Sequence, residues 1–304
     1  MNDGPIEAWL AGAFPSMAPL REQLRRGARS EAPLLIVGEP GVGRSSLARA
    51  LHAASRRVAG PLVEVDVGSV PVELFESELF GHVAGAFTGA ERERTGRIGE
   101  AQGGTLLLDR VEELPIGVQP KLLRFLSERV YSPLGGRERG ADVRMMAVGS
   151  HDLTRRVERG DFRQDLFYRI EVIAFEIPPL RRRLQDLRAA IPSVLEDLRR
   201  RYGRNELTIS EEDLAWMLEH SWPGNLRQVR NLLERSAVLQ RDGVLRVDRP
   251  GAASDERPST LEESERAAIL RALSYTRGHQ GRAAELLGIS RKGLWEKRKR
   301  YGIP

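Results

Sequence analysis

The sequence predicts an α/β protein: a parallel sheet with flanking helices, an all-helical region after it, and a C-terminal helix-turn-helix. Through residue 180, short apolar runs alternate with patterns of helical period, which is typical of a parallel sheet covered on both faces. A glycine-rich turn joins the first apolar run to a helical pattern. Beyond residue 180 the strand-like runs stop and helical patterns dominate.

Five strands are expected in the first part of the chain, within residues 34–37, 61–68, 103–109, 142–150 and 172–180. The third run, Gly-Gly-Thr-Leu-Leu-Leu-Asp, is almost entirely apolar, as in a strand that is buried on both faces. The first 30 residues predict a short lead-in and one helix. We therefore predict that residues 1–178 form the α/β core.

Three further segments are expected after the core. Residues 179–241 predict a small helical lid, in which Ser210, followed by acidic residues, is expected to cap a helix. Residues 242–260 are rich in Pro, Gly, Asp and Ser, which is typical of a linker. Residues 261–304 return to helical patterns and end in the helix-turn-helix.

Composition limits the classes of function. No run of about 18 apolar residues exists, so no membrane partner is expected. The absence of Cys excludes disulfides and thiolate metal sites and fits a cytoplasmic location. The net charge is +5, and the eleven residues from Ser290 hold six basic residues against one Glu. This cluster predicts a nucleic-acid-binding surface, the alternative being a solvated helix.

The glycine-rich turn fits the phosphate-binding pattern G-x-x-x-x-G-K-[ST] except that Arg44 replaces Lys. Glycines let backbone N–H groups surround a phosphate, and the N-terminus of the next helix adds positive potential. We therefore expect the whole turn to contact a nucleotide: Gly38, Glu39, Pro40, Gly41, Val42, Gly43, Arg44, Ser45 and Ser46. The alternative is an ordinary glycine-rich turn.

The third strand ends in Asp109, which with Ser45 is a candidate ligand pair for Mg²⁺. Arg110 follows, and a guanidinium has no acceptor and cannot act as a base. Glu112 and Glu113 are close in sequence, but an offset of two or three residues is expected to rotate either side chain away from the site.

Residues 85–90, Gly-Ala-Phe-Thr-Gly-Ala, combine two glycines with one aromatic residue and carry no charge. This composition predicts a mobile loop tip that exposes the ring of Phe87. Such a loop suits contact with a partner better than it suits chemistry.

In this order, the phosphate-loop pattern, the 85–90 loop and the strand ending in Asp109 resemble the AAA+ domain of the bacterial enhancer-binding proteins, which activate sigma-54 RNA polymerase. The resemblance covers nearly the whole chain. It implies ATP and Mg²⁺ as cofactors and a ring of subunits. It also implies contact with the sigma-54 RNA polymerase holoenzyme through Gly85, Ala86, Phe87, Thr88, Gly89 and Ala90.

The resemblance also assigns three arginines. Arg163 and Arg169 match the arginines that reach a neighbouring subunit's ATP and, with Asp109, form the expected catalytic set. Surface pairing with Asp161 and Asp165 is the alternative for these two. Arg227 matches the lid arginine that senses the phosphates, unless its role is only structural.

Four positions depart from the family pattern. Arg44 replaces the Lys, and Arg110 replaces the Glu that polarises the attacking water. Asp66 replaces the Asn that couples this Glu to the loops, and Ser150 replaces the sensor Asn. Together the four departures indicate relaxed or lost hydrolysis.

The C-terminal segment resembles the Fis-like helix-turn-helix of many of these activators, which implies binding of double-stranded DNA as a dimer, with the second helix in the major groove. Gly288 is expected to form the turn. The residues expected to pack inward are Ala283, Ala284, Leu286, Leu287, Leu294 and Trp295. The expected DNA contacts are Ser290, Arg291, Lys292, Lys297, Arg298 and Lys299.

Three hypotheses remain open from the sequence. The first is an active ATPase activator, and the second is a hydrolysis-impaired regulator that mixes with active paralogous subunits or occupies their DNA. The third is a DNA-binding, sigma-contacting protein that no longer uses nucleotide. We expect no receiver or sensing domain before the core, and we therefore expect control from abundance or a partner.

Overall fold

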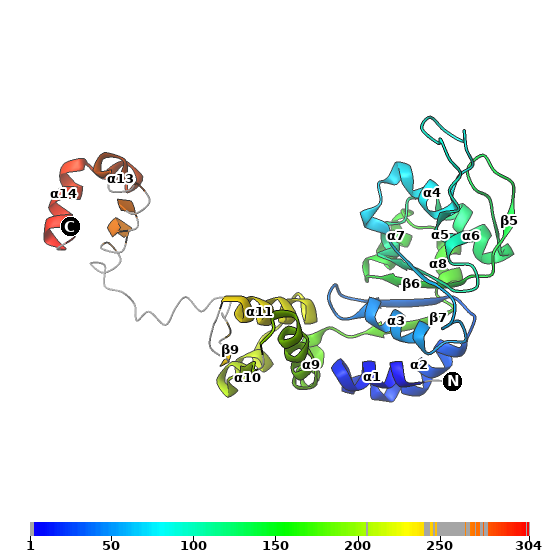
Figure 1. Ribbon diagram of the computed structural model, residues 1–304, viewed down its shortest axis with the longest axis horizontal. Coiled ribbons are helices and arrows are strands. Elements are labelled where there is room, and N and C mark those ends of the chain that lie inside the picture. The colour runs from blue at the N-terminus through cyan, green and yellow to red at the C-terminus, as the bar shows by residue number, and fades with distance from the viewer. Residues whose placement is uncertain are drawn as a thin grey trace. The chain divides into compact units, whose positions relative to one another are not determined.

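The computed structural model describes residues 3–304 except 205, 240–243, 246, 248–264, 266–267, 271, 274–275, 277–278, 302 and 304. The chain divides into two compact units, Met1–Val247 and Asp248–Pro304. The first unit holds a sheet, two layers of helices and a lid (Figure 1).

A five-stranded parallel sheet forms the centre of the first unit, with the strand order β2-β3-β6-β1-β7. Its strands are β1 (Leu34–Gly38), β2 (Leu62–Asp66), β3 (Thr105–Asp109), β6 (Arg144–Gly149) and β7 (Ile173–Ile177). Four strands fall within the expected runs and β1 extends one residue beyond its run, to Gly38, so the parallel α/β core is confirmed. The parallel register brings the ends of β1, β3 and β6 to one edge of the sheet.

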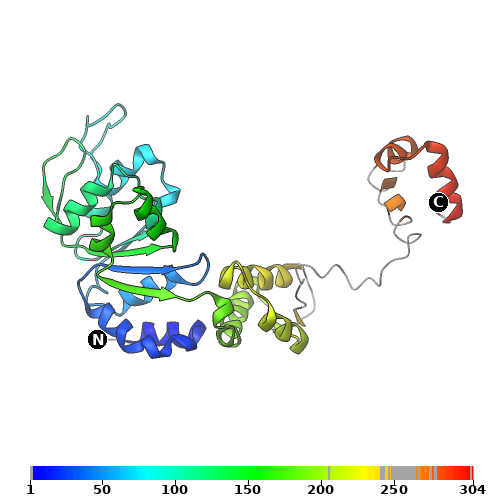
Figure 2. The ribbon, with the colours of Figure 1, turned by 180° about the vertical axis from the view of Figure 1, so that it is seen from behind.

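Two layers of helices cover the sheet, one on each face (Figures 1 and 2). Each layer has its own apolar core, because both faces of the sheet carry buried side chains. One layer holds α1 (Gly4–Ala13), the 3₁₀ helix η1 (Pro15–Leu20), α2 (Arg21–Arg29) and α3 (Arg44–Ala53). The other holds α4 (Val72–Phe80), α5 (Gly96–Glu100), α6 (Gln119–Glu128), α7 (Asp152–Arg159) and α8 (Gln164–Ile170).

Short elements lie between the longer helices and strands. They are η2 (Val67–Ser69), η3 (Val111–Glu113), η4 (Leu180–Arg182) and an antiparallel pair of β4 (Val130–Tyr131) with β5 (Arg139–Gly140). Helix α1 lies where the sequence predicts only a lead-in. Its Ile6 and Leu10 are buried against the sheet's helices, so tertiary packing stabilises a segment whose own pattern is weak.

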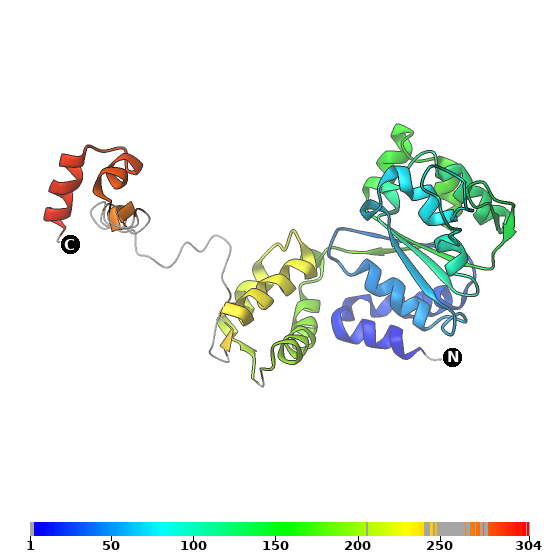
Figure 3. The same ribbon diagram turned by 45° about the horizontal axis from the view of Figure 1, so that its top comes forward.

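The lid follows β7 as a helical cluster (Figure 3). It contains α9 (Gln185–Tyr202), α10 (Glu211–Glu219) and α11 (Asn225–Leu239). Ser210 caps α10 as expected, because its hydroxyl accepts the N–H of Asp213 at 3.1 Å. The expectation of an all-helical lid and a linker from residue 242 is wrong in one respect. A short strand β9 (Val244–Leu245) pairs in parallel with β8 (Thr208–Ile209) and belongs to the first unit.

The second unit contains the expected helix-turn-helix, with α13 (Gln280–Leu286) and α14 (Arg291–Arg300). Gly288 has a φ of 65°, and the hydroxyl of Ser290 accepts the N–H of Gly293 at 3.0 Å, so the turn and the cap are confirmed. Ala283, Ala284 and Leu294 are buried. Apart from Val244, Leu245 and Val247, the predicted linker lies outside the described residues.

Two residues expected to pack inward do not. Leu286 is 59% exposed and Trp295 is 56% exposed. Successive residues of a helix are about 100° apart, so once Leu294 takes the inward position Trp295 must face elsewhere. Among the described residues, no helix has the length and apolarity that a membrane span requires.

Candidate functional site

The glycine-rich turn lies at the carboxyl edge of the sheet, between β1 and α3. Gly41 and Gly43 have φ values of 81° and 107°, which only Gly adopts without strain. A Cβ on Gly41 would also lie 2.5 Å from the carbonyl oxygen of Gly224 in the lid. The turn therefore has the backbone that lets N–H groups point at an anion.

Ser45 and Asp109 lie together as expected. The Ser45 hydroxyl donates to Asp109 Oδ2 at 2.6 Å, and the Arg110 N–H donates to the other oxygen at 2.8 Å. A hydroxyl and a carboxylate are the hard oxygen ligands that Mg²⁺ takes beside a nucleotide. The turn and this pair thus fit a nucleotide with a divalent cation.

Arg44 joins the ends of two strands. Its Nη1 donates to the carbonyl oxygens of Gly38 and Gly149 at 2.9 and 2.5 Å. Burial lowers the pKa of Arg44, and the charges of Asp109 and Glu112 oppose this effect. The guanidinium of Arg44 thus bridges β1 and β6 through backbone carbonyls. The ammonium of a lysine at this position is more compact and would form such a bridge with a different geometry.

Arg110 turns away from the glycine-rich turn. It has a φ of 57° at the end of β3, and its guanidinium forms an ion pair with Asp66 of β2 at 2.5 Å. The hydrogen bond to Asp66 raises the pKa of Arg110. Glu113 lies 3.5 Å from the same guanidinium. Two of the four departures from the family pattern therefore pair with each other.

The expectation that Glu112 points away from the site is wrong. Its side chain is 8% exposed, and Oε1 accepts the N–H of Ser150 at 3.1 Å. The left-handed backbone at Arg110 and the following 3₁₀ turn reverse the chain, and this reversal brings Glu112 back over β6. Nothing in the sequence indicates that Arg110 has a left-handed backbone. The position of Glu112 therefore could not be predicted from its distance along the chain from Asp109.

The lid contacts the glycine-rich turn directly. Arg181 holds Glu39 through two hydrogen bonds of 2.6 and 2.8 Å, and Asn225 donates to Glu39 and to the carbonyl of Pro40. The hydrogen bonds from Arg181 lower the pKa of Glu39 to about 2, against the opposing effect of burial. The carboxylate of Glu39 thus serves lid docking, and only its backbone is left to meet a phosphate.

A buried junction reinforces this contact. Arg183 donates to the carbonyl of Val42 at 3.1 Å and pairs with Asp186 at 3.2 Å. Asp186 in turn accepts the backbone N–H and the hydroxyl of Ser16 at 2.8 and 2.6 Å. Arg183 and Asp186 are both almost completely buried. The junction ties together the lead-in, the turn and the lid.

Arg227 of α11 lies beside the turn. A Cβ on Gly41 would be 3.0 Å from the Cβ of Arg227, and the charge of Arg227 acts on Arg44. The structure therefore places this lid arginine near the expected phosphate position. Its contact with a phosphate stays a prediction.

Aromatic residues of the lead-in also meet the turn, and sequence reasoning missed them. Trp9 Nε1 donates to the hydroxyl of Ser46 at 3.0 Å, and its ring stacks on Phe14 with centroids 4.0 Å apart. A Cβ on Gly43 would lie 2.5 Å from the Phe14 ring. Trp9 and Phe14 lie well before the turn in the sequence, so no local pattern signals this contact.

Arg163 and Arg169 lie at helix α8, where neither contacts the turn. Arg163 pairs with Asp165 at 2.7 Å, and Arg169 donates to the carbonyl of Leu126 at 3.0 Å. The alternative of pairing with Asp165 is thus realised for Arg163 within one chain. A role toward a neighbouring subunit stays a prediction for both.

The 85–90 loop forms a tight tip between α4 and α5. Gly85 N–H donates to Ala90 O at 2.8 Å, and Ala90 N–H donates to Phe87 O at 3.0 Å. The ring of Phe87 is 41% exposed and meets His82 edge-on at 5.0 Å. The exposed ring is confirmed, while Ala90 is buried at the base of the tip.

The basic residues of α14 that are expected to contact DNA differ in exposure. Arg291, Lys292 and Lys299 are exposed, but Lys297 is half-buried and forms an ion pair with Glu265. Arg298 is also half-buried, and its Nε is buried without a hydrogen-bond partner among the described residues. Contact of Lys297 and Arg298 with DNA stays a prediction, and for Lys297 it competes with the ion pair to Glu265.

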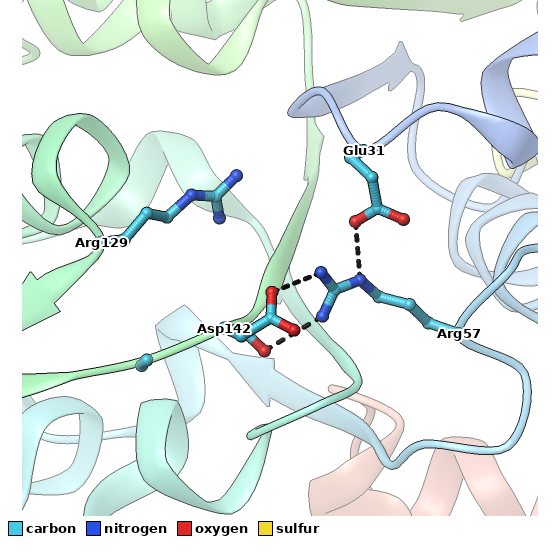
Figure 4. Close-up of a pocket in the computed structure, with 5 residues that line it drawn as sticks. Glu31, Arg57, Arg129 and Asp142 are labelled. Carbon is cyan, nitrogen blue, oxygen red and sulfur yellow. Dashed lines mark hydrogen bonds and ion pairs between the residues drawn. The ribbon is translucent and has the colours of Figure 1, made fainter.

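A pocket of about 440 Å³ lies elsewhere, among Glu31, Arg57, Arg129, Ala141 and Asp142 (Figure 4). Arg57 donates to Glu31 at 2.7 Å and to Asp142 at 2.5 Å. Glu31 precedes β1 and Asp142 precedes β6, so the pocket lies at the amino edge of the sheet, opposite the turn. Two carboxylates already match the charge of Arg57, and we assign no ligand here.

Three family models match the chain. A sigma-54 interaction domain matches residues 10–176, an AAA+ ATPase lid domain matches residues 181–266, and a bacterial regulatory protein of the Fis family matches residues 260–301. The first model alone covers more than half of the chain. The chain belongs to the bacterial sigma-54-dependent transcriptional regulators, with an AAA+ core, a lid and a Fis-type helix-turn-helix.

Individual regulators are similar along nearly the whole chain. The alginate biosynthesis regulator AlgB of Pseudomonas aeruginosa is 40% identical over 299 residues, which are 95% of this chain and 66% of AlgB. The Nif-specific regulatory protein of Azotobacter vinelandii is 38% identical over 94% of this chain and 57% of its own length. The chain spans less than two thirds of the length of these two relatives.

A solved structure shares the architecture. NtrX from Brucella abortus, crystallised in complex with ADP, superposes with a TM-score of 0.72 at 30% identity. The match covers 95% of this chain and 69% of NtrX. A further NtrX structure, in complex with ATP, gives a TM-score of 0.69.

Proposed function

We propose that this chain is a sigma-54-dependent transcriptional regulator that binds ATP with Mg²⁺ at the carboxyl edge of its sheet but hydrolyses ATP slowly. Residues 85–90 contact the sigma-54 RNA polymerase holoenzyme, and α14 binds double-stranded DNA. The observation that carries the impaired hydrolysis is the ion pair between Arg110 and Asp66. A cation and its counterion stand where the family places a carboxylate and an amide.

The nucleotide-binding parts have separate roles. The N–H groups of the turn and Arg44 hold the phosphates, and Arg227 approaches them from the lid. Ser45 and Asp109, which lie within hydrogen-bond distance of each other, would hold Mg²⁺. When bound, this ion neutralises negative charge on the β- and γ-phosphates. The two ADP- and ATP-bound NtrX structures support the assignment, since their fold is the same.

One experiment separates binding from hydrolysis. We expect a fluorescent ATP analogue to titrate to saturation in the presence of Mg²⁺, while release of inorganic phosphate stays far below the turnover of about 1 s⁻¹ or more that is typical of enzymes. Phosphate release by the pure protein at an ordinary enzymatic rate would contradict the impaired hydrolysis. A chain that binds no nucleotide would contradict the role of the turn.

A second function, modulation of active paralogous subunits in a mixed ring, is favoured by Arg163. Its side chain is 44% exposed on α8, where a neighbouring subunit can approach it. We expect the chain to change the phosphate release of an active family member when the two are mixed, and we expect an Arg163→Ala/Arg169→Ala variant to lose this effect. An unchanged rate with the unmodified chain would exclude the mixed ring.

A further inference from the structure

The carboxylate of Glu112 is buried but only half satisfied. Oε1 accepts the N–H of Ser150 at 3.1 Å, whereas Oε2 has no hydrogen-bond partner among the residues that the structure describes. The whole residue is 8% exposed. A buried carboxylate oxygen without a partner costs free energy, so its presence indicates that a partner binds there in a functional state.

The strand order determines which way Glu112 faces. The sheet runs β2-β3-β6-β1, and both Arg110 and Glu112 follow β3. Arg110 reaches back to Asp66 of β2, whereas Glu112 reaches over the end of β6. Since β1 and the glycine-rich turn lie beyond β6, Glu112 faces the phosphate-binding side and Arg110 faces the opposite side.

The free oxygen lies next to the groups that hold the turn. A Cβ on Gly149 would lie 3.4 Å from Oε2 of Glu112. The carbonyl oxygen of the same Gly149 accepts the guanidinium of Arg44 at 2.5 Å. The charges of Glu112 and Asp109 both act on Arg44. A carboxylate oxygen is thus available beside the residue that occupies the lysine position of the turn.

The carboxylates of Asp109 and Glu113 are both engaged by other groups, unlike Oε2 of Glu112. Asp109 is engaged by Ser45 and by the N–H of Arg110. Glu113 is directed to Arg110 on the β2 side, and its side chain is 38% exposed. Of the acidic residues that follow β3, Glu112 is the one with a buried free acceptor on the phosphate side.

We infer that Glu112 accepts the proton of the attacking water in the slow turnover that this chain retains. The inference rests on the proposed binding of ATP. The water oxygen bonds to the γ-phosphorus, and the bond from that phosphorus to the β–γ bridging oxygen breaks. ADP keeps the electron pair of the broken bond. The proton of the water passes to Oε2 of Glu112 and is then released to solvent.

Glu112→Gln tests the inference in the full chain. Glutamine keeps an oxygen that accepts the Ser150 N–H, but it replaces the free acceptor by an N–H donor. We expect the rate of phosphate release under saturating ATP to fall about 10²-fold, in the range that a lost general base gives. The affinity for a fluorescent ATP analogue and the Tm stay within error. Glu113→Gln, the matched neighbour, keeps the wild-type rate.

The outcomes separate this inference from the proposed function. Unchanged turnover in Glu112→Gln overturns the role of Glu112 and leaves ATP binding standing, as does nucleotide binding without any turnover in the wild type. A parallel loss of affinity and Tm in Glu112→Gln also overturns it, because a structural role has that effect. Fast wild-type turnover that Glu112→Gln abolishes contradicts the impaired hydrolysis but supports Glu112. A chain that binds no nucleotide overturns both.

Discussion

At the scale of the residue, the backbone of Arg110 decides how two side chains lie beside the candidate nucleotide site. Its left-handed backbone sends its own side chain to β2 and brings Glu112 back over β6. The pairing with Asp66 could have been predicted from the sequence. β2 and β3 are adjacent, Asp66 faces Asp109 in the register, and two departures of opposite charge at neighbouring positions indicate a contact. The direction of the Glu112 side chain could not have been predicted, because the sequence does not specify a positive φ at an arginine.

Restoring the carboxylate at position 110 tests this account. Arg110→Glu alone places a third acidic group beside Asp66 and Glu113, so repulsion limits its benefit. We expect Arg110→Glu/Asp66→Asn to release phosphate faster than Arg110→Glu does, and we expect addition of Arg44→Lys to raise the rate further. Single-turnover phosphate release measures each step. Equal rates in the single and double variants would refute the role of the Asp66 contact.

At the scale of the element, docking of the lid depends on pH through Glu39. Its pKa is about 2 in the folded chain, below the usual 4.5, because Arg181 donates to the carboxylate. This group therefore stabilises the fold above pH 4.5, and its contribution is lost as the pH falls from 4.5 towards 2. We expect the Tm of the wild type to exceed that of Glu39→Gln at pH 6 and the two to converge near pH 2. A difference that does not vary with pH would argue against the ion pair.

The 85–90 loop supports a second prediction. Phe87 and Thr88 are exposed at its tip, and the fold does not depend on their side chains. We expect Phe87→Ala and Thr88→Ala to abolish retention of purified sigma-54 in a pull-down with a transition-state analogue, with no change in Tm. Glu91→Gln, just outside the tip, is the matched control. Loss of retention in the control as well would assign the effect to the wider loop.

Helix α14 allows two lysines to be compared. Each phosphate that a lysine neutralises contributes about −0.9 to the slope of log K against log salt. We expect Lys299→Ala to flatten this slope by about 1, because Lys299 is exposed. Lys297→Ala should leave the slope unchanged, because its ammonium is held by Glu265. DNA-binding titrations at several salt concentrations measure both slopes. A flatter slope for Lys297→Ala alone would show that Lys297 contacts DNA, as the sequence predicts.

Elements with purely local signals were predictable, and faces set by tertiary contacts were not. The five strands are continuous apolar runs, and the caps at Ser210 and Ser290 follow from residue type and position. The prediction that Trp295 packs inward is wrong, because the inward face of a helix depends on what packs against it. Strand β9 was not predicted, because its two residues lie in a polar stretch and form a strand only by pairing with β8.

At the scale of the whole molecule, the sequence and the structure agree on the order of core, lid and helix-turn-helix. The agreement follows from spacing along the chain, since each of these parts has its own buried cluster of apolar residues. The contacts between core and lid were invisible in the sequence. They join residues as distant in the chain as Glu39 and Asn225.

The junction of Ser16, Val42, Arg183 and Asp186 joins core and lid through buried polar contacts. To detach the lid, the chain would have to break the hydrogen bonds from Arg183 to the carbonyl of Val42 and from Ser16 to Asp186. These bonds contribute about 1.5–3 kcal/mol each, because one partner of each is charged. We therefore expect core and lid to unfold in a single calorimetric transition. In Asp186→Asn the Arg183 charge stays buried and unpaired, so the transition should move to lower temperature and broaden into two. A single, unshifted transition in that variant would show that the two subdomains are joined by apolar contacts alone.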